Sequence, residues 1–172
     1  MPELLQYVED HDLWRFALPD NQAFNAALRQ YPHDFTVWDE LIIDLRDEEL
    51  RQQFLAKGQL IVDFEAKLID KLLSFKHQVE LNDMTIWAVN ATRVYRSILG
   101  NKLAEYNEIE QKPAIGIVYY YYGGRVHISL RSKGEYDVSK IAEQFGGGGH
   151  KHAASFSVQD FSSLPFTFLE AH

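Results

Sequence analysis

A chain of 172 residues is long enough to bury one ordinary hydrophobic core, or one compact domain with a helical extension. Its hydrophobic residues, 46% of the total, occur in short runs, none near the roughly 20 apolar residues of a membrane span. The absence of cysteine excludes disulfides and thiolate chemistry, and the first residues lack the pattern of a secretory signal. We therefore expect a cytoplasmic protein without a membrane partner.

The net charge of −8 comes from one half of the chain. Residues 1–75 contain 15 acidic and 7 basic side chains, whereas residues 76–172 contain 10 of each. The neutral second half lacks the broad basic surface of a non-specific duplex binder, but it can still gather a few cations in one pocket. Any nucleic-acid ligand is therefore expected to be short, or to be held by an end.

The first half has the pattern of helices in series. Apolar residues recur at helical spacing from Phe24 to Tyr31, with Asp20 or Asn21 placed to cap the start and Pro32 to mark the end. A second helix is predicted after residue 34, with a stripe formed by Phe35, Trp38, Leu41, Ile42 and Leu45.

A third, longer helix is predicted to begin at the acidic residues 47–49, because negative charge favours a helix N-terminus. Gly58 is expected to bend or interrupt this helix. Its apolar stripe comprises Leu60, Phe64, Leu68, Leu72 and Phe75.

The second half has the pattern of strands and helices in alternation. Residues 84–90 alternate as a strand, and residues 92–106 predict a helix that is interrupted or capped at Gly100-Asn101. Residues 114–122 and 125–131 predict a hairpin, because two glycines separate two strand-like runs.

The remaining elements close the predicted sheet. Asp137 is placed to cap a short helix over residues 138–145, and strands are expected at residues 153–158 and 166–169. The fold class is therefore α/β (α+β). We expect a helical N-terminal connector over residues 1–76, followed by a small mixed β-sheet domain flanked by helices over residues 77–172.

Four consecutive glycines, residues 146–149, precede His150 and Lys151. Glycine loses more conformational entropy on folding than any other residue, so an ordered glycine run suggests that something approaches its backbone closely. Backbone N–H groups in such a loop can form an anion site. The alternative is an unstructured glycine loop between a helix and a strand.

Three successive motifs carry a family resemblance: Ser129-Leu-Arg-Ser132, Asp137-Val-Ser-Lys-Ile-Ala142 and Gly146-Gly-Gly-Gly-His-Lys-His-Ala-Ala154. Together they resemble the DHH-associated domain, the C-terminal domain of DHH-family phosphoesterases, over roughly residues 81–169. Ser155 departs from the family pattern, in which many members have glycine after the two alanines. The resemblance implies that this domain holds the substrate over a catalytic domain. The substrate-binding candidates that it implies are Ser129, Arg131, Ser132, Gly146, Gly147, Gly148, Gly149 and His150.

The family's catalytic domain binds two metal ions, Mn²⁺ in the complete enzyme, through carboxylate-rich motifs that include Asp-His-His. This sequence contains no Asp-His-His, so the chain is interpreted as truncated, inactive alone and without a tightly bound metal ion. Residues 7–14 resemble the last metal-binding motif of that domain, and Asp10 is the best match to a metal ligand. His11 and Asp12 would help it to hold a divalent cation. Residues 9–12 could instead form a solvated charged turn.

Other aromatic and histidine residues are assigned to structure. Aromatic side chains at strand or helix spacing more often pack in a core than bind a ligand, and only Tyr122 is kept as a candidate for base stacking. The residues assigned to packing are Trp14, Trp38, Trp87 and Tyr119 to Tyr121. The histidines lack metal-ligand spacing.

Two hypotheses on function remain. The chain is either the substrate-binding C-terminal part of a phosphoesterase, or a stand-alone non-catalytic module that binds nucleotides or nucleic acid. Expected ligands are an oligonucleotide end, a small or cyclic nucleotide, or a polyphosphate-like chain. A Ser–His nucleophilic hydrolase is a poorer third hypothesis, because no orienting acid is recognisable.

A related module occurs in alanyl-tRNA synthetases, although residues 9–12 favour the phosphoesterase arrangement. A homo-oligomer is also expected to be possible.

Overall fold

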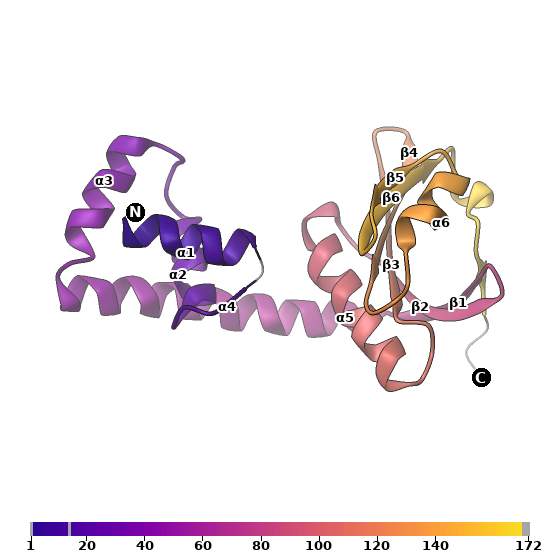
Figure 1. Cartoon of the computed structure of the whole chain (residues 1–172), viewed down its shortest axis with the longest axis horizontal. Coiled ribbons are helices and arrows are strands. Elements are labelled where there is room, and N and C mark those ends of the chain that lie inside the picture. Colours follow the sequence, from indigo (N-terminus) through magenta and orange to yellow (C-terminus); the bar gives the residue numbers. More distant parts are fainter. Residues whose placement is uncertain (1, 14, 170–172) are drawn as a thin grey trace. The chain divides into compact units, whose positions relative to one another are not determined.

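The protein folds into helices and one mixed sheet, which confirms the predicted α/β (α+β) class (Figure 1). The computed structural model describes residues 2–13 and 15–169. It divides into two compact units, Met1–Leu68 and Ile69–His172. This division falls earlier than the predicted boundary at residue 76. No helix within the described ranges is long and apolar enough to cross a membrane.

The first unit is helical. Its elements are α1 (Glu3–Asp12), α2 (Asn21–Leu28), α3 (Phe35–Asp44) and most of α4 (Glu48–Leu73). At the centre of its core, the rings of Tyr7 and Phe24 stack with centroids 4.0 Å apart, and the Phe24 ring also meets the edge of Phe54. The core residues are Leu4, Tyr7, Phe24, Ala27, Leu28, Leu41, Leu45 and Phe54.

The predicted ends of the short helices are partly corrected. Helix α2 ends at Leu28, before Tyr31, and Asp20 makes no capping hydrogen bond because its backbone is left-handed, with φ 54°. Asp34 does cap α3, since its side chain accepts from the N–H groups of Thr36 and Val37. Helix α1 had no sequence prediction, and Trp14 lies outside the described residues.

Helix α4 continues through Gly58, which was expected to bend or interrupt it. A Cβ atom at Gly58 would lie 1.8 Å from the Ala23 carbonyl oxygen, so glycine lets α2 and α4 cross closely. The predicted apolar stripe is wrong as a buried face, because Leu60 and Phe64 are exposed. The buried side chains Ile69 and Leu73 each come one residue after a stripe residue, so the buried face is rotated from the predicted one.

The second unit is built on a seven-stranded sheet with the order β5-β6-β4-β3-β2-β1-β7. The β2–β3 pair is parallel and every other neighbouring pair is antiparallel. The strands are β1 (His77–Leu81), β2 (Met84–Asn90), β3 (Ile115–Tyr122), β4 (Arg125–Ser132), β5 (Gly148–His150), β6 (Ala153–Val158) and β7 (Thr167–Phe168).

The predicted hairpin is confirmed, with Tyr122 paired to Arg125 around two glycines of positive φ. Positive φ at both central residues is the type I′ geometry that matches the twist of the flanking strands. The edge strand β5 was not predicted. Half of the glycine run therefore belongs to the sheet.

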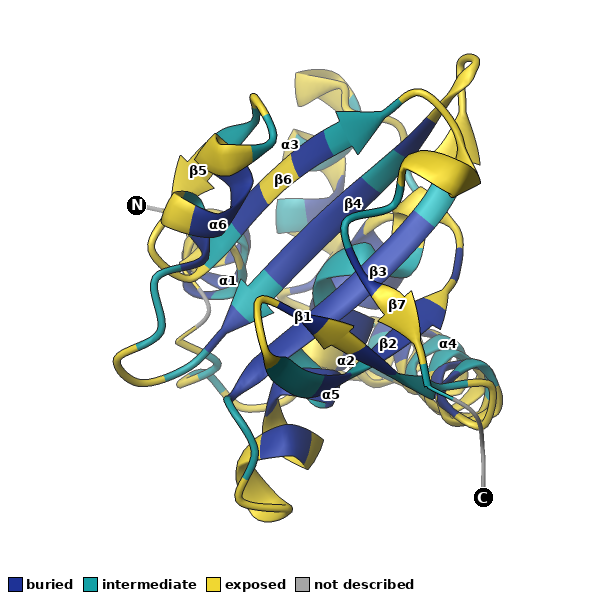
Figure 2. Ribbon diagram, turned by 90° about the vertical axis from the view of Figure 1, so that its right-hand side faces the viewer, coloured by how far each residue is buried: buried dark blue, intermediate teal, exposed yellow. Residues whose placement is uncertain are grey.

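Two helices pack on opposite faces of this sheet. Helix α5 (Arg96–Ile109) follows the 3₁₀ turn Arg93–Tyr95 and packs with Ile69, Leu73 and Val118 on one face. Helix α6 (Val138–Gln144) packs on the other face, where Ile117 and Ile128 are buried. Figure 2 shows the buried strands β3 and β4 at the centre of the sheet, with α6 on the near side.

Candidate functional site

The strand register brings four of the eight predicted binding residues onto one sheet face, called here the Arg131 face. In its first row, Arg131 of β4 pairs with Ala153 of β6, which pairs with His150 of β5. In the second row, Ser129 of β4, Ser155 of β6 and Gly148 of β5 lie side by side. Side chains two apart on a strand point to the same face, so both rows share one surface.

Arg131 is a half-buried cation with no carboxylate partner among the described residues. Its Nη1 donates to the Leu130 carbonyl oxygen at 2.9 Å, and its Nη2 donates to Ser97 Oγ at 2.9 Å. The first bond folds the guanidinium back along β4. A guanidinium carries five N–H donors, so several remain for an anion.

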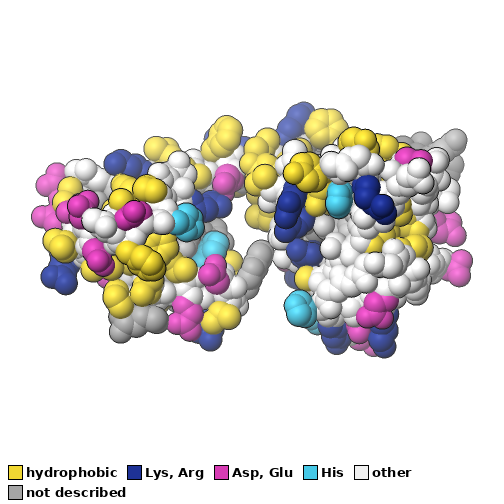
Figure 3. All heavy atoms as spheres, turned by 90° about the horizontal axis from the view of Figure 1, so that it is seen from above, with side chains coloured by type: hydrophobic (Ala, Val, Ile, Leu, Met, Phe, Trp, Pro, Cys, Tyr) yellow, Lys and Arg dark blue, Asp and Glu magenta, His cyan; other side chains and the backbone are white. Residues whose placement is uncertain are grey.

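The surroundings of Arg131 are electropositive. Burial lowers the pKa of the Arg131 guanidinium, and the positive charge of Arg96 lowers that pKa further. Arg96 and Ser97 form the first turn of α5, where the helix dipole favours negative charge. Figure 3 shows Lys and Arg side chains and a histidine on one side of the second unit, with acidic side chains toward its margin. The neighbouring Arg96 and the N-terminus of α5 favour a multiply charged anion at Arg131.

Arg96 and Ser97 had no place in the sequence analysis, because their role depends on where α5 begins. Gly100 contributes as well, although it was expected to interrupt or cap the helix. Helix α5 continues through it, and a Cβ atom there would lie 2.8 Å from Arg131 Cγ. Gly100 therefore leaves room for the stem of Arg131.

We expect Gly100→Ala to weaken anion binding without unfolding the second unit. Alanine favours a helix interior by about 1 kcal/mol over glycine, but its methyl group would displace the Arg131 stem. A loss of about fivefold in pyrophosphate affinity, or roughly 1 kcal/mol, is expected by calorimetry. An unchanged affinity at unchanged stability would show that the position of the Arg131 stem does not matter.

The four glycines differ in their structural roles. Gly146, with φ 72°, follows α6; its N–H donates to the Glu143 carbonyl oxygen, and the Gly147 N–H donates to the Ala142 carbonyl oxygen. These two bonds form the Schellman motif that often ends a helix. The run is therefore neither an unstructured loop nor a single anion nest.

Gly147 and Gly149 are required by close approach to β6. A Cβ atom at Gly147 would lie 2.2 Å from the Ser155 carbonyl oxygen, and one at Gly149 would lie 2.4 Å from the Ala153 carbonyl oxygen. Gly148 is different, because a Cβ atom there would meet nothing within 4 Å and its φ is not positive. Packing among the described residues does not explain glycine at position 148, because the space beside its Cα is open.

Ser129 and Ser132 have different surroundings although both are buried. Ser129 belongs to the second row, and its Oγ makes no hydrogen bond to another described residue. Ser132 lies on the opposite face, where its Oγ donates to the Tyr136 carbonyl oxygen at 2.8 Å and lies 3.2 Å from His152 Nδ1. Of the two, only Ser129 lies with Arg131.

Asp10 is a buried carboxylate of the first unit, with 6% of its surface exposed. Its Oδ1 accepts from the Ala17 N–H at 3.1 Å, and its Oδ2 accepts from the Leu18 N–H and from Asn21 Nδ2. His11 Nδ1 lies 3.2 Å from Asn21 Oδ1. Asp10 thus orders the turn between α1 and α2.

The described residues contain no group of three His, Cys, Asp or Glu side chains placed to hold a metal ion. Asp10 is already engaged by three donors, so these residues do not fit the two-metal centre that the family resemblance implies.

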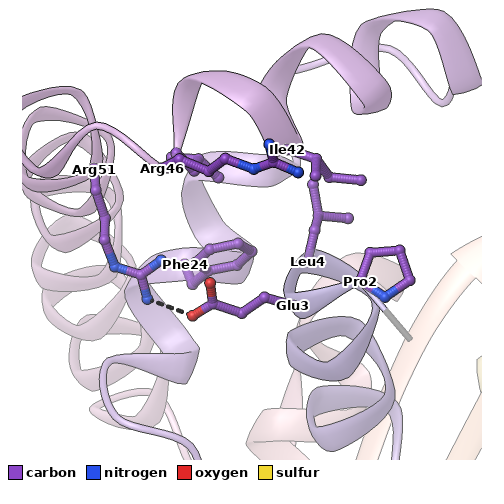
Figure 4. A pocket seen from close by; sticks show the side chains of 8 residues that line it. Pro2, Glu3, Leu4, Phe24, Ile42, Arg46 and Arg51 are labelled. Atoms are coloured by element: carbon purple, nitrogen blue, oxygen red, sulfur yellow. Dashed lines mark hydrogen bonds and ion pairs between the residues drawn. The ribbon is translucent and has the colours of Figure 1, made fainter.

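The first unit contains a cavity of about 290 Å³. Figure 4 shows Glu3 directed toward Arg51, and their ion pair of 2.9 Å crosses the cavity beside Phe24. None of the predicted binding residues lines it. Its lining residues are Pro2, Glu3, Leu4, Phe24, Ile42, Leu45, Arg46 and Arg51.

Residues 86–169 match the family described as the DHHA1 domain. An uncharacterized protein of Acanthamoeba polyphaga mimivirus is 26% identical over 171 residues, which are 96% of this chain and 39% of that protein. The oligoribonuclease NrnB of Bacillus subtilis is 29% identical over 151 residues, 84% of this chain and 33% of that protein. The chain thus spans less than half the length of either curated relative.

Two solved structures share the fold. A pGpG-specific phosphodiesterase from Vibrio cholerae has a TM-score of 0.54 and 12% identity, over 91% of this chain and 61% of that one. The DHH domain of a protein from a family of ribosomal proteins has a TM-score of 0.53 and 14% identity, over 98% of this chain and 42% of that one.

Proposed function

We propose, from the premise that residues 86–169 are a DHHA1 domain of the DHH phosphoesterase family, that this chain is a substrate-binding part of such an enzyme. Its ligand is a phosphate group on a nucleotide or an oligonucleotide end. The names of two similar proteins, an oligoribonuclease and a pGpG-specific phosphodiesterase, support this ligand class. The chain resembles only part of each of these proteins. That the complete enzyme hydrolyses phosphodiester or phosphoanhydride bonds is therefore part of the proposal.

The observation that carries the proposal is the half-buried Arg131 guanidinium without a carboxylate partner among the described side chains. Desolvating a cation costs free energy, and a bound phosphate would offset that cost through charge-assisted hydrogen bonds. Ser129, Gly148 and His150 occupy the same face, where hydroxyl, backbone and imidazole groups can complete the contacts.

In this proposal Mn²⁺ and its ligands belong to the complete enzyme. Asp10 is engaged by three hydrogen-bond donors in the turn between α1 and α2, so it is not counted among those ligands. This chain should therefore bind phosphate compounds without turning them over, with or without added Mn²⁺. Hydrolysis of a dinucleotide by the purified chain would contradict the proposal that this chain binds its ligand without catalysis.

Calorimetric titration with pyrophosphate and with a 5′-phosphorylated dinucleotide tests the role of Arg131. Arg131→Ala is expected to lower both affinities at least about tenfold, since a hydrogen bond to a charged group contributes about 1.5–3 kcal/mol. Arg131→Lys should restore little of the loss, because the planar fork that matches phosphate is absent. Thermal unfolding of each variant verifies the fold.

Lys140→Ala is the matched control, because Lys140 is an exposed cation of α6, on the opposite sheet face. It should bind both ligands as the parent chain does. Equal losses in the Arg131→Ala and Lys140→Ala variants would indicate a general effect of net charge. Unchanged binding by a folded Arg131→Ala variant would remove Arg131 from the site.

A further inference from the structure

The Arg131 face has a third row, and this row is aromatic. Tyr120 of β3 pairs with His127 of β4, which pairs with Ser157 of β6. The rings of Tyr120 and His127 stack with centroids 5.4 Å apart and planes at 15°. Tyr122, two residues along β3, lies 6.2 Å from the His127 ring. Tyr120, Tyr122 and His127 are called the aromatic row below.

A hydrogen bond to the hairpin backbone holds His127 of the aromatic row, and Arg125 beside the row is bonded to β6. His127 Nε2 donates to the Tyr122 carbonyl oxygen at 3.2 Å, because a carbonyl can only accept. Arg125 donates through Nε to Ser157 Oγ at 3.0 Å and through Nη2 to the Ser157 carbonyl oxygen at 3.1 Å. The hydrogen bonds restrict both side chains before any ligand arrives.

Two tyrosines of β3 differ in their burial: Tyr119 packs in the core, whereas Tyr122 does not. Tyr119, on the α6 face, is 6% exposed, and its ring meets Phe161, Phe166 and Phe168. Tyr122 is 63% exposed, and its one recorded ring neighbour is His127, itself only half-buried. Core packing therefore accounts for Tyr119 but not for Tyr122.

We propose that the aromatic row stacks a nucleobase of the ligand whose phosphate lies at Arg131. The second row, Ser129, Ser155 and Gly148, separates the two subsites with small side chains. The Arg131 guanidinium donates to the carbonyl oxygen of Leu130, the residue between Arg131 and Ser129 on β4. A sugar lying over the small side chains would join the phosphate to the base.

This inference rests on the proposed function and adds a nucleobase subsite to its phosphate site. Every nucleobase has a face that can stack on an aromatic ring, and such stacking tolerates any sequence. An inorganic polyphosphate has no such face. The ligand is therefore a nucleotide or an oligonucleotide end of relaxed sequence preference, and pyrophosphate occupies the Arg131 subsite alone.

Calorimetry of the full chain with AMP and with ribose 5-phosphate isolates the base, since both carry the same phosphate. AMP should bind about tenfold more tightly, in the range that stacking one base provides. Tyr122→Ala should remove most of that difference while leaving the affinities for ribose 5-phosphate and pyrophosphate unchanged. The His127→Leu variant should behave in the same way.

Tyr121→Ala is the matched control. Tyr121 is 62% exposed, as Tyr122 is, but it lies on the opposite face beside Phe161. This variant should keep the preference for AMP. Upfield shifts of the adenine protons on binding, lost in Tyr122→Ala, would report stacking directly.

The outcomes separate the two proposals. Equal affinities for AMP and ribose 5-phosphate, each lost in Arg131→Ala, would overturn the stacking subsite and leave the phosphate site standing. An AMP preference that survives Tyr122→Ala and His127→Leu would also overturn the stacking subsite. If the folded parent chain binds none of the three ligands, both proposals fail.

Discussion

Gly147→Ala is expected to disrupt the edge of the sheet, whereas Gly148→Ala should leave the fold intact and weaken ligand binding. The two positions are adjacent, but only Gly147 has a close neighbour: its added Cβ would lie 2.2 Å from the Ser155 carbonyl oxygen and 2.5 Å from Phe156 Cβ. Gly148 has open space. The same substitution thus tests packing at one position and ligand approach at the next.

Gly147→Ala is expected to lower stability, and Gly148→Ala is expected to lower ligand affinity. Overpacking typically costs about 1–3 kcal/mol, and a backbone contact cannot yield as a side chain does, so Gly147→Ala should lower the free energy of unfolding by about 3 kcal/mol. Gly148→Ala should change it by less than about 0.5 kcal/mol, the usual range for surface substitutions. Its affinity for AMP, whose sugar would lie over the second row of the Arg131 face, should fall about tenfold. Urea unfolding and calorimetry measure the two effects.

A Gly148→Ala variant with parental stability and parental affinity would exclude a ligand contact at this backbone position. A Gly147→Ala variant as stable as the parent would show that β5 can move away from β6 at little cost. The second result would also weaken the assignment of β5 as an ordered part of the site.

Local signals made the second unit more predictable than the first. The hairpin was predictable because Gly123 and Gly124 separate two strand-like runs, and Asp137 marks the start of α6 through its bond to the Ser139 N–H. These features depend on residues close in sequence. The stripe from Leu60 to Phe75 also suggested local order, yet periodicity alone could not show that Leu60 and Phe64 remain exposed.

The candidate site was predictable in its residue types and not in its arrangement. Arg131 and His150 were identified from motifs, but their shared face follows from the register of β4, β6 and β5. Gly100 suggested a helix break, and its role appears only where α5 crosses Arg131. Ser132 and Ser129 look alike in sequence, and strand alternation separates them.

Asp10→Ala is expected to destabilise the first unit by about 2 kcal/mol, because three donors would lose their acceptor. Two of these donors are backbone N–H groups of the turn between α1 and α2. The third is the side chain of Asn21, which is 3% exposed and also donates to the Tyr7 carbonyl oxygen. Urea unfolding in the presence of EDTA measures the loss without any contribution from a metal ion.

The control is Asp12→Ala, which removes an exposed carboxylate two residues away and should change stability by less than about 0.5 kcal/mol. Pyrophosphate affinity should be unchanged in both variants, because the phosphate subsite belongs to the second unit. A carboxylate kept only as a metal ligand would behave differently. Its removal would leave the metal-free chain as stable as the parent, and that result would return Asp10 to the metal-binding role suggested by its motif.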